Sequence, residues 1–251
     1  MGLVISIANH KGGVGKTTTA VNLSAGLSRS GYKVLIIDSD PQANATFALG
    51  LGKQEKNLYQ TLAFQDAISK AIIPVNRLEI VPSSVHLAAF EKNNDIGKEF
   101  ILQEQLAEVK DNYDFILIDC PPSLGALTVS ALTASDYALI VLQPEPLSIQ
   151  GMTEFVKILR TVKTRMNPEL DILGLLITCF DSRTKLHKEL LEYLETEYKN
   201  MVFKTRIRTN ISIPEAQSMG QDIFQYAPNS PGCEDYTSLT NELVARVTGE
   251  Q

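Results

Sequence analysis

The sequence predicts an α/β fold: a three-layer, doubly wound and mostly parallel sheet with helices on both faces. Two observations predict it. Short apolar runs alternate with amphipathic stretches of helical length along the whole chain, which is the order that βαβ units require. The apolar runs contain few polar residues, as expected for parallel strands that are buried on both faces.

The strands are expected where these apolar runs lie. The first two, Leu3–Ala8 and Val34–Asp38, are separated by a helical stretch, Lys16–Ser30, which Gly31 terminates. Later strands are expected at Leu78–Pro82, Phe115–Asp119, Tyr137–Gln143 and Ile172–Cys179, with a short edge strand at Val202–Thr205. Further helices are expected across 43–73 with breaks, across Leu87–Val109 with an interruption at Asn93–Gly97, and at Ala126–Ala134, Ser148–Met166, Arg183–Tyr198 and Tyr236–Val247.

The composition is that of a water-soluble globular protein. Of the 251 residues, 44% are hydrophobic and 21% are charged, and we expect one domain that spans 1–251. No run approaches the roughly 20 apolar residues of a membrane span, so we expect a cytoplasmic protein. The cysteines are widely spaced and form no C-x-x-C pair, which predicts free thiols at Cys120, Cys179 and Cys233.

A glycine-rich segment, HKGGVGKTTT at positions 10–19, joins the first strand to the first helix. Its three glycines allow backbone N–H groups to converge on one anion, and the following helix adds its positive N-terminal end. Lys16 is then expected to reach the β and γ phosphates of a nucleotide, and the hydroxyl of Thr17 to hold Mg²⁺. The alternative is an ordinary turn with a solvated lysine, which the order of strand, loop, GKT and helix disfavours.

One position departs from the standard phosphate-loop pattern, G-x-x-x-x-G-K-[ST]. Counting back from Gly15, the pattern requires glycine at position 10, where this chain has His10. The loop instead carries a second lysine, Lys11. We interpret the segment as a deviant Walker A loop whose extra lysine has a role of its own.

Two acidic segments follow strands that are expected to flank this loop. Asp38 ends the run VLIID, with Asp40 just beyond it, and Asp119 ends the run FILID. An aspartate after apolar strand residues is the Walker B arrangement, in which the carboxylate holds Mg²⁺ or its bound water. Either acid alone is as readily explained as a strand terminator. Two acids at matched positions beside a GKT loop favour a nucleotide site at the carboxyl ends of the strands.

Four motifs occur in order along the chain: KGGVGKTTT, IIDSDPQAN, ILIDCPPS and TRIRTNISIPEAQSMGQDIFQYAPNSPGCEDY. Together they resemble the ParA/MinD family of deviant Walker A P-loop ATPases, from Leu3 to about Val247. The DPQAN and DCPPS forms look most like ParA-type (Soj-like) partition ATPases without an N-terminal helix-turn-helix. The resemblance implies a P-loop NTPase fold and a protein that binds ATP and Mg²⁺, forms an ATP-sandwich homodimer and binds duplex DNA non-specifically. It also implies slow ATP hydrolysis on the nucleoid, stimulated by a ParB-type centromere-binding partner, to segregate plasmid or chromosome DNA.

The resemblance also implies roles for individual residues. Lys11 is similar to the signature lysine, which reaches across the dimer to the phosphates of the other subunit. Asp40 resembles the acid that positions the attacking water, and with Lys11 and Lys16 it makes up the implied catalytic set. The phosphate cradle is implied at Gly12, Gly13, Val14, Gly15, Lys16, Thr17 and Thr18, the Mg²⁺ site at Thr17, Asp40 and Asp119, and the adenine contacts at Arg208 and Asn210.

The segment around Arg208 departs from the family pattern. Chromosomal members usually read I-P-R-N-V-R-L, where this chain reads IRTNISI at 207–213. Arg208 therefore stands in place of the usual proline, and Ser212 in place of an arginine that is implicated in DNA contact. This departure leaves the adenine and DNA contacts open and shifts the resemblance toward plasmid- or cargo-type partition proteins.

Positive charge is unevenly distributed along the chain. The net charge of −6 disfavours a general nucleic-acid binder, but residues 156–208 hold eleven of the 23 Lys and Arg and only seven of the 29 Asp and Glu. Non-specific DNA binding needs several cations on one face. The candidates are Arg183, Lys185, Lys188, Lys199, Lys204 and Arg206, and the alternative is a solvated helix balanced by its own glutamates.

Other functions remain open at this point. A MinD-like membrane protein would end in a basic amphipathic helix, whereas this chain ends in TGEQ, so no membrane partner is expected. An ATPase that positions a protein assembly, or a metal-handling or ligase-type P-loop relative, stays an alternative. A GTPase is disfavoured because the sequence has no N-K-x-D base-reading motif.

Overall fold

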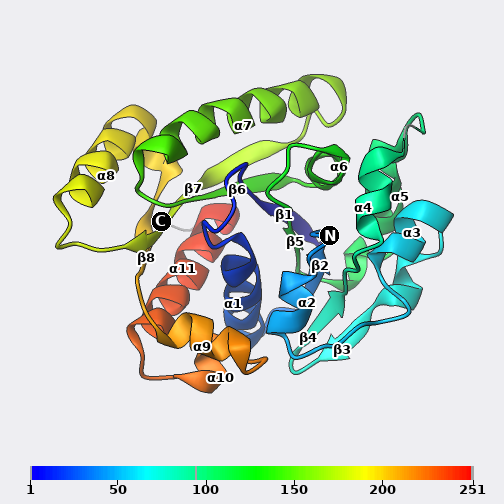
Figure 1. Ribbon diagram of the computed structural model, residues 1–251, viewed down its shortest axis with the longest axis horizontal. Helices are drawn as coiled ribbons and strands as arrows, with labels where there is room; N and C mark the ends of the chain where they lie inside the picture. The colour runs from blue at the N-terminus through cyan, green and yellow to red at the C-terminus, as the bar shows by residue number, and fades with distance from the viewer. Residues whose placement is uncertain (1, 94, 250–251) are drawn as a thin grey trace.

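The structure is a computed structural model that describes residues 2–93 and 95–249. At its centre lies an eight-stranded sheet with the strand order β3-β4-β2-β5-β1-β6-β7-β8 (Figure 1). Neighbouring strands are parallel, except that β3 runs antiparallel to β4. The strands are β1 Leu3–Ala8, β2 Val34–Asp38, β3 Ile73–Val75, β4 Leu78–Val81, β5 Phe115–Asp119, β6 Tyr137–Leu142, β7 Asp171–Phe180 and β8 Val202–Arg208.

Helices cover both faces of the sheet and complete three layers (Figure 1). One face packs against α1 (Lys16–Arg29), α2 (Asn44–Ala48), α9 (Ser212–Ser218), α10 (Ile223–Tyr226) and α11 (Pro231–Thr248). The other packs against α3 (Leu58–Phe64), α4 (Leu87–Lys92), α5 (Ile101–Ala107), α6 (Ala126–Thr133), α7 (Pro146–Arg165) and α8 (Lys185–Tyr198). Short 3₁₀ turns lie at Ile68–Ala71, Lys98–Phe100, Lys110–Asn112 and Lys199–Met201. The predicted fold class is confirmed.

The sheet forms because its central strands are apolar on both faces. In β1, the side chains of Val4 and Ala8 enter the core beneath α6 and α7, whereas those of Ile5 and Ile7 enter the core beneath α1. Every residue of β2 and β5 is buried. Each fully buried Val, Leu or Ile side chain stabilises the fold by roughly 1.5–3 kcal/mol. This burial fixes the register of the strands, and with it the position of the acids at their ends.

The edge strand β8 is longer than predicted, running to Arg208 instead of ending at Thr205. The strand continues because it stays paired with β7, where Arg206 lies opposite Ile177 and Arg208 opposite Phe180. Two carboxylates of α11 also accept hydrogen bonds from its N–H groups. Glu242 accepts from Lys204 at 2.8 Å and from Thr205 at 2.7 Å, and Asp235 accepts from the Arg208 N–H at 2.8 Å. Capping of this kind protects an exposed strand edge.

Helix boundaries account for most of the differences from prediction. Helix α11 begins at Pro231 and not at Tyr236, because Ser230 accepts a hydrogen bond from the Cys233 N–H at 3.2 Å and proline suits the first turn. Helix α7 likewise begins at Pro146 instead of Ser148. The helices α9 and α10, and the strand β3, were not predicted. In the predicted interruption at Asn93–Gly97, position 94 lies outside the described residues.

Strand register brings the acidic residues beside the glycine-rich loop. Strand β5 pairs directly with β1, so that Asp119 lies opposite Ile7, and β2 pairs with β5, so that Asp38 lies opposite Asp119. The expectation that both acid-bearing strands flank the loop is correct for β5 and wrong for β2, because β5 lies between β2 and β1. Within the described residues, no helix combines the length and apolar character needed to cross a bilayer.

Candidate functional site

The glycine-rich loop connects β1 to α1 and depends on glycine at two positions. Gly13 and Gly15 have φ values of +74° and +91°, in the left-handed region that residues with a Cβ rarely adopt. Gly15 also precedes the first residue of α1, so the loop delivers the chain directly to the helix N-terminus. The predicted strand-loop-helix arrangement of a phosphate-binding loop is therefore present.

The carbonyl oxygens of the loop are held by the surrounding protein. The amine of Lys16 donates to the Lys11 carbonyl at 3.0 Å, and the hydroxyl of Thr178 donates to the Val14 carbonyl at 2.6 Å. The side-chain amide of Gln143 donates to the Gly13 carbonyl at 2.9 Å. With its carbonyls engaged in this way, the loop presents its N–H groups to an incoming anion.

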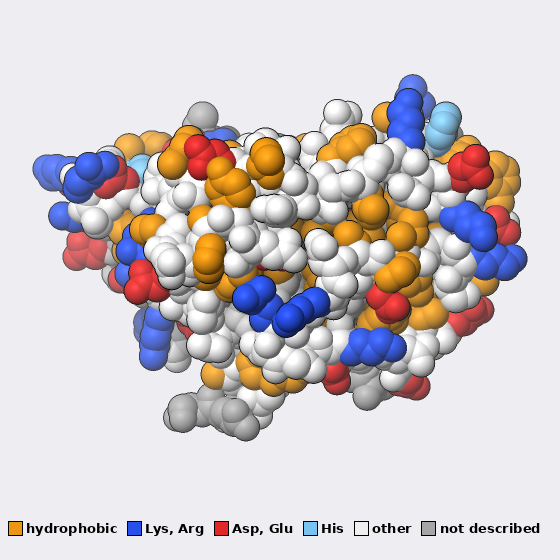
Figure 2. Space-filling model, turned by 90° about the horizontal axis from the view of Figure 1, so that it is seen from below, with side chains coloured by type: hydrophobic (Ala, Val, Ile, Leu, Met, Phe, Trp, Pro, Cys, Tyr) orange, Lys and Arg blue, Asp and Glu red, His pale blue; other side chains and the backbone are white. Residues whose placement is uncertain are grey.

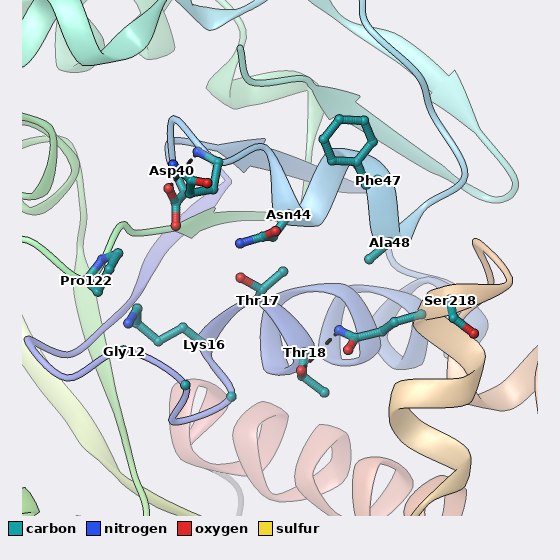
Figure 3. A pocket seen from close by; sticks show the side chains of 14 residues that line it. Gly12, Lys16, Thr17, Thr18, Asp40, Asn44, Phe47, Ala48, Pro122 and Ser218 are labelled. Carbon is teal, nitrogen blue, oxygen red and sulfur yellow. Dashed lines mark hydrogen bonds between the residues drawn. The ribbon is translucent and has the colours of Figure 1, made fainter. Parts of the chain in front are cut away.

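The loop forms one wall of a cavity of about 520 Å³. In Figure 3, Lys16, Thr17 and Asp40 face the same space, with Pro122 near Lys16 and Phe47 at the far side. Of the predicted phosphate and metal residues, Lys11, Val14 and Asp119 are missing from its lining, and the last two are fully buried. The lining residues are Gly12, Gly13, Gly15, Lys16, Thr17, Thr18, Asp40, Gln42, Asn44, Phe47, Ala48, Pro122, Gln217 and Ser218.

Acidic side chains are concentrated behind this cavity, where burial disfavours their charged forms. Burial raises the pKa of Asp38 to about 6, against the effect of hydrogen bonds from Thr46 and the Asp40 N–H. Burial, followed by the charge of Asp38, raises the pKa of Asp119 well above its usual range. Burial also lowers the pKa of Lys16, while Asp119 opposes that shift. One lysine amine thus faces a cluster of carboxylates that attracts further positive charge.

The cavity residues fit a magnesium ion. Both carboxylate oxygens of Asp119 are buried without a hydrogen-bond partner among the described residues, an arrangement that calls for a counter-charge. Hydroxyl and carboxylate oxygens such as those of Thr17 and Asp40 are ligands that Mg²⁺ prefers. Across residues 2–93 and 95–249, no three His, Cys, Asp or Glu side chains converge into a metal cluster. The arrangement suits an ion that keeps waters and takes other ligands from phosphate.

The extra lysine of the loop lies outside the cavity lining. The amine of Lys11 forms an ion pair with Glu145, the residue that precedes α7. Both side chains are partly exposed, at 30% for Lys11 and 47% for Glu145. Lys11 therefore contributes no side chain to its own cavity in this structure and is accessible from outside.

The predicted adenine contacts lie elsewhere. The guanidinium of Arg208 makes three hydrogen bonds to Asp235, at 2.9, 3.0 and 2.6 Å, and one to Glu234 at 2.6 Å, all on α11. The side chain of Asn210 accepts a hydrogen bond from the Ser212 N–H at 2.8 Å. Neither residue lines the cavity described above, so their contact with a base stays a prediction.

Sequence reasoning missed several cavity residues. The side-chain amide of Gln217, on α9, donates to the hydroxyl of Thr18 at 3.0 Å and closes one side of the loop. Phe47 and Asn44, on α2, also line the cavity. The motifs DPQAN and EAQSMG contain Asn44 and Gln217, so a signal was present in the sequence. It specified no contact because the α2 and α9 segments meet only in the folded chain.

Comparison with known proteins places this geometry in a family. A family model described as an AAA domain matches residues 2–172. The sporulation initiation inhibitor protein Soj of Bacillus subtilis (strain 168) is 42% identical over 252 residues, covering 98% of this chain and 99% of the relative. The chromosome-partitioning ATPase Soj of Treponema pallidum (strain Nichols) is 40% identical over 250 residues, covering 98% of each.

The chain belongs to the ParA/Soj family of partition ATPases. The resemblance inferred from the four motifs is thereby confirmed. A solved structure, cobyrinic acid a,c-diamide synthase from Mycobacterium smegmatis with bound ADP and magnesium, superposes with a TM-score of 0.87 at 30% identity, covering 100% of this chain and 97% of the other. The ParA/Soj chain therefore shares its fold with a protein that is named for a different activity.

The DNA candidates of this ParA/Soj chain fall into two groups. Three are paired with acids: Arg183 with Asp181, Lys185 with Glu189 and Arg206 with Glu195. The other three, for which the described residues provide no ion-pair partner, are Lys188, Lys199 and Lys204. Figure 2 shows Lys and Arg side chains gathered, with acidic ones between them, at the end of the molecule where α8 lies in Figure 1.

Replacing Asp119 by Asn is expected to stabilise the unliganded chain. The substitution removes a buried acid whose charged form is disfavoured by burial and by Asp38, so the melting temperature without nucleotide and metal should rise by roughly 2–4 °C. With ATP and Mg²⁺, the variant should lose the further stabilisation that the wild type gains from binding. Differential scanning calorimetry measures both effects, with the exposed Asp66→Asn as the control. A lower melting temperature in the unliganded variant contradicts the prediction.

Proposed function

We propose that this protein is a ParA-type partition ATPase that binds ATP and Mg²⁺ and hydrolyses ATP slowly. The observation that carries the proposal is the cavity itself: a phosphate loop with Lys16 and Thr17 lines it, Asp40 lies on its wall, and the Asp119 carboxylate is buried behind it. ATP binding then creates a sandwich homodimer that binds duplex DNA without sequence preference. A ParB-type centromere-binding partner stimulates hydrolysis on the nucleoid, and the cycle segregates plasmid or chromosome DNA.

Each residue contributes by position and charge. The N–H groups of Gly12–Thr18 and the amine of Lys16 neutralise the phosphates, and Gln217 orients the hydroxyl of Thr18 for the α phosphate. Thr17 and Asp119 would hold Mg²⁺, with Asp40 beside it, and the ion would neutralise charge on the phosphate oxygens. Asp40 orients the water that attacks the γ phosphate. Phosphoryl transfer needs little more than this positioning and neutralisation.

Three measurements on the wild type test the proposed function together. Turnover of ATP should be slow alone and should increase when duplex DNA and a ParB-type partner are added. Light scattering after size exclusion should show a monomer without nucleotide and a dimer with a slowly hydrolysed ATP analogue. Absence of ATP binding in calorimetry overturns the proposal.

Non-specific DNA binding is expected to depend on the unpaired lysines near α8. Replacing Lys188, Lys199 and Lys204 together by Gln should make the slope of log K against log salt concentration shallower by about 3 per protomer. Each lost phosphate contact contributes about 0.9 to the magnitude of that slope. Filter binding with ATP and random duplex DNA measures the slope. The matched control replaces three exposed lysines near α3, Lys53, Lys56 and Lys70, by Gln. An unchanged slope in the first variant, or an equal change in the control, contradicts this assignment.

A ligase-type function is the second candidate, favoured by the TM-score of 0.87 with cobyrinic acid a,c-diamide synthase. A ligase consumes ATP only when its carboxylate substrate and amine donor are present, because the phosphate activates the carboxylate. A partition ATPase needs neither. ATP turnover that responds to DNA and the partner, in the absence of any acceptor substrate, excludes the ligase function.

A further inference from the structure

The segment between Asp119 and α6 is held in place by a residue from a different helix. Its residue Pro122 lines the nucleotide cavity, and its end is bound by Glu91 of α4. One carboxylate oxygen of Glu91 accepts the Ala126 N–H at 2.8 Å. The other accepts the Leu127 N–H at 3.3 Å and the Ser123 hydroxyl at 3.3 Å.

These contacts supply a cap that α6 does not have in its own sequence. The residue before α6 is Gly125, which has no side chain to accept hydrogen bonds from the first turn. Glu91, which lies 35 residues before Ala126 in the chain, accepts these hydrogen bonds instead. Its negative charge also suits a helix N-terminus. The position of α6, and of the segment that leads into it, therefore depends on α4.

The close approach of Glu91, and not the backbone conformation, is what disfavours a side chain at Gly125. Its φ of −88° is accessible to any residue. A Cβ at this position, however, would lie 2.0 Å from Oε2 of Glu91 and 2.7 Å from its carboxyl carbon. An alanine at 125 would therefore have to displace the Glu91 carboxylate from its position.

Both sides of the contact are anchored. Lys98 is buried and donates to the Phe90 carbonyl at 2.9 Å and to the Asn93 carbonyl, which fixes the end of α4 that carries Glu91. On the other side, the hydroxyl of Thr128 donates to the Ser123 carbonyl at 2.6 Å. The 120–125 segment is thus held at its start by β5 and at its end by Glu91.

We propose that Glu91 is a positioning residue for ATP hydrolysis, because it fixes the segment that connects Asp119 to α6 and places Pro122 at the γ-phosphate end of the cavity. This inference rests on the proposed ATPase function. Glu91 makes no hydrogen bond to the Gly12–Thr18 loop. Its loss should therefore reduce the rate of the chemical step and leave nucleotide affinity nearly unchanged.

Two single variants and their combination test the proposal. Glu91→Ala and Gly125→Ala should each lower kcat about tenfold, with KM for ATP within about twofold of the wild type. The double variant should lose no more than either single variant, since both changes remove the same contact. Glu91→Gln keeps one acceptor oxygen and should lose less than Glu91→Ala. The matched control is Glu104→Ala, at an exposed residue of α5.

Hydrogen exchange gives a readout that does not depend on turnover. In Glu91→Ala without nucleotide, the amides of 123–127 should exchange at least about tenfold faster, while those of α1 stay as in the wild type. Unchanged kcat, an equal rise in KM, or additive losses in the double variant overturn the role of Glu91. If the wild type hydrolyses ATP and Glu91→Ala is normal, only this inference fails. If the wild type does not hydrolyse ATP, the proposed function fails, and this inference with it.

Discussion

Lys11→Ala is expected to abolish ATP-dependent dimerisation while ATP still binds to the monomer. The amine of Lys11 lies outside the lining of its own cavity and is paired with Glu145 at the surface. The cavity retains Lys16 and the glycine loop for its own nucleotide. A lysine placed in this way can serve the phosphates of a second copy, in the manner of a catalytic group supplied in trans. Removing one such charge pair across an interface costs about 2–5 kcal/mol, so dimerisation should weaken by at least about 30-fold.

Light scattering at several protein concentrations, with ATP and Mg²⁺, measures this effect. Lys11→Gln should behave like Lys11→Ala, since neither side chain carries a positive charge. Glu145→Ala is the matched control, because it breaks the same ion pair and leaves the lysine in place, and it should still dimerise. Lys16→Ala should instead lose ATP binding itself. A Lys11→Ala protein that dimerises like the wild type shows that this lysine does not complete the partner's site.

The fold was predictable because its strands are buried on both faces. Such strands must be almost wholly apolar, and β2 and β5 appear in the sequence as uninterrupted apolar runs that end in an acid. The phosphate loop was predictable for a related reason. Glycines at 13 and 15 are required by a backbone conformation, and conformational requirements of this kind are local.

The contacts that were not predicted join segments far apart in the sequence. Gln217 meets Thr18 across 199 positions, and Arg208 meets Asp235 on a helix whose start was placed five residues too late. Carboxylates of α11 bind the guanidinium of Arg208, and the identity of residue 208 alone did not indicate this contact. Glu91 carries no motif, and its role emerges only when α4 is seen against the start of α6. Local pattern fixes elements and loops, whereas such pairings depend on how the layers pack.

Asp40→Ala is expected to bind ATP and dimerise but to hydrolyse ATP at least about 100-fold more slowly. Asp40 lines the cavity and is only 6% exposed. One of its carboxylate oxygens accepts the Gln42 N–H at 2.9 Å, and its backbone carbonyl accepts the Ser83 hydroxyl at 2.5 Å. The carboxylate is therefore held in one orientation, facing the cavity on the side of Lys16 and Pro122 (Figure 3). A carboxylate fixed in this place can orient a water for attack on the γ phosphate.

Slow hydrolysis should convert the Asp40→Ala protein into a stable ATP-bound dimer. Because the phosphate loop, Lys11 and Asp119 are intact, the variant should stay dimeric and retain DNA after ATP is added, whereas the wild type returns to monomer as ATP is consumed. Single-turnover measurements of phosphate release separate this effect from slower product release. The control, Asp66→Ala, alters an exposed aspartate that lies outside the cavity lining. Normal single-turnover rates in Asp40→Ala mean that another group positions the water; a loss of dimerisation means that Asp40 acts in assembly before it acts in chemistry.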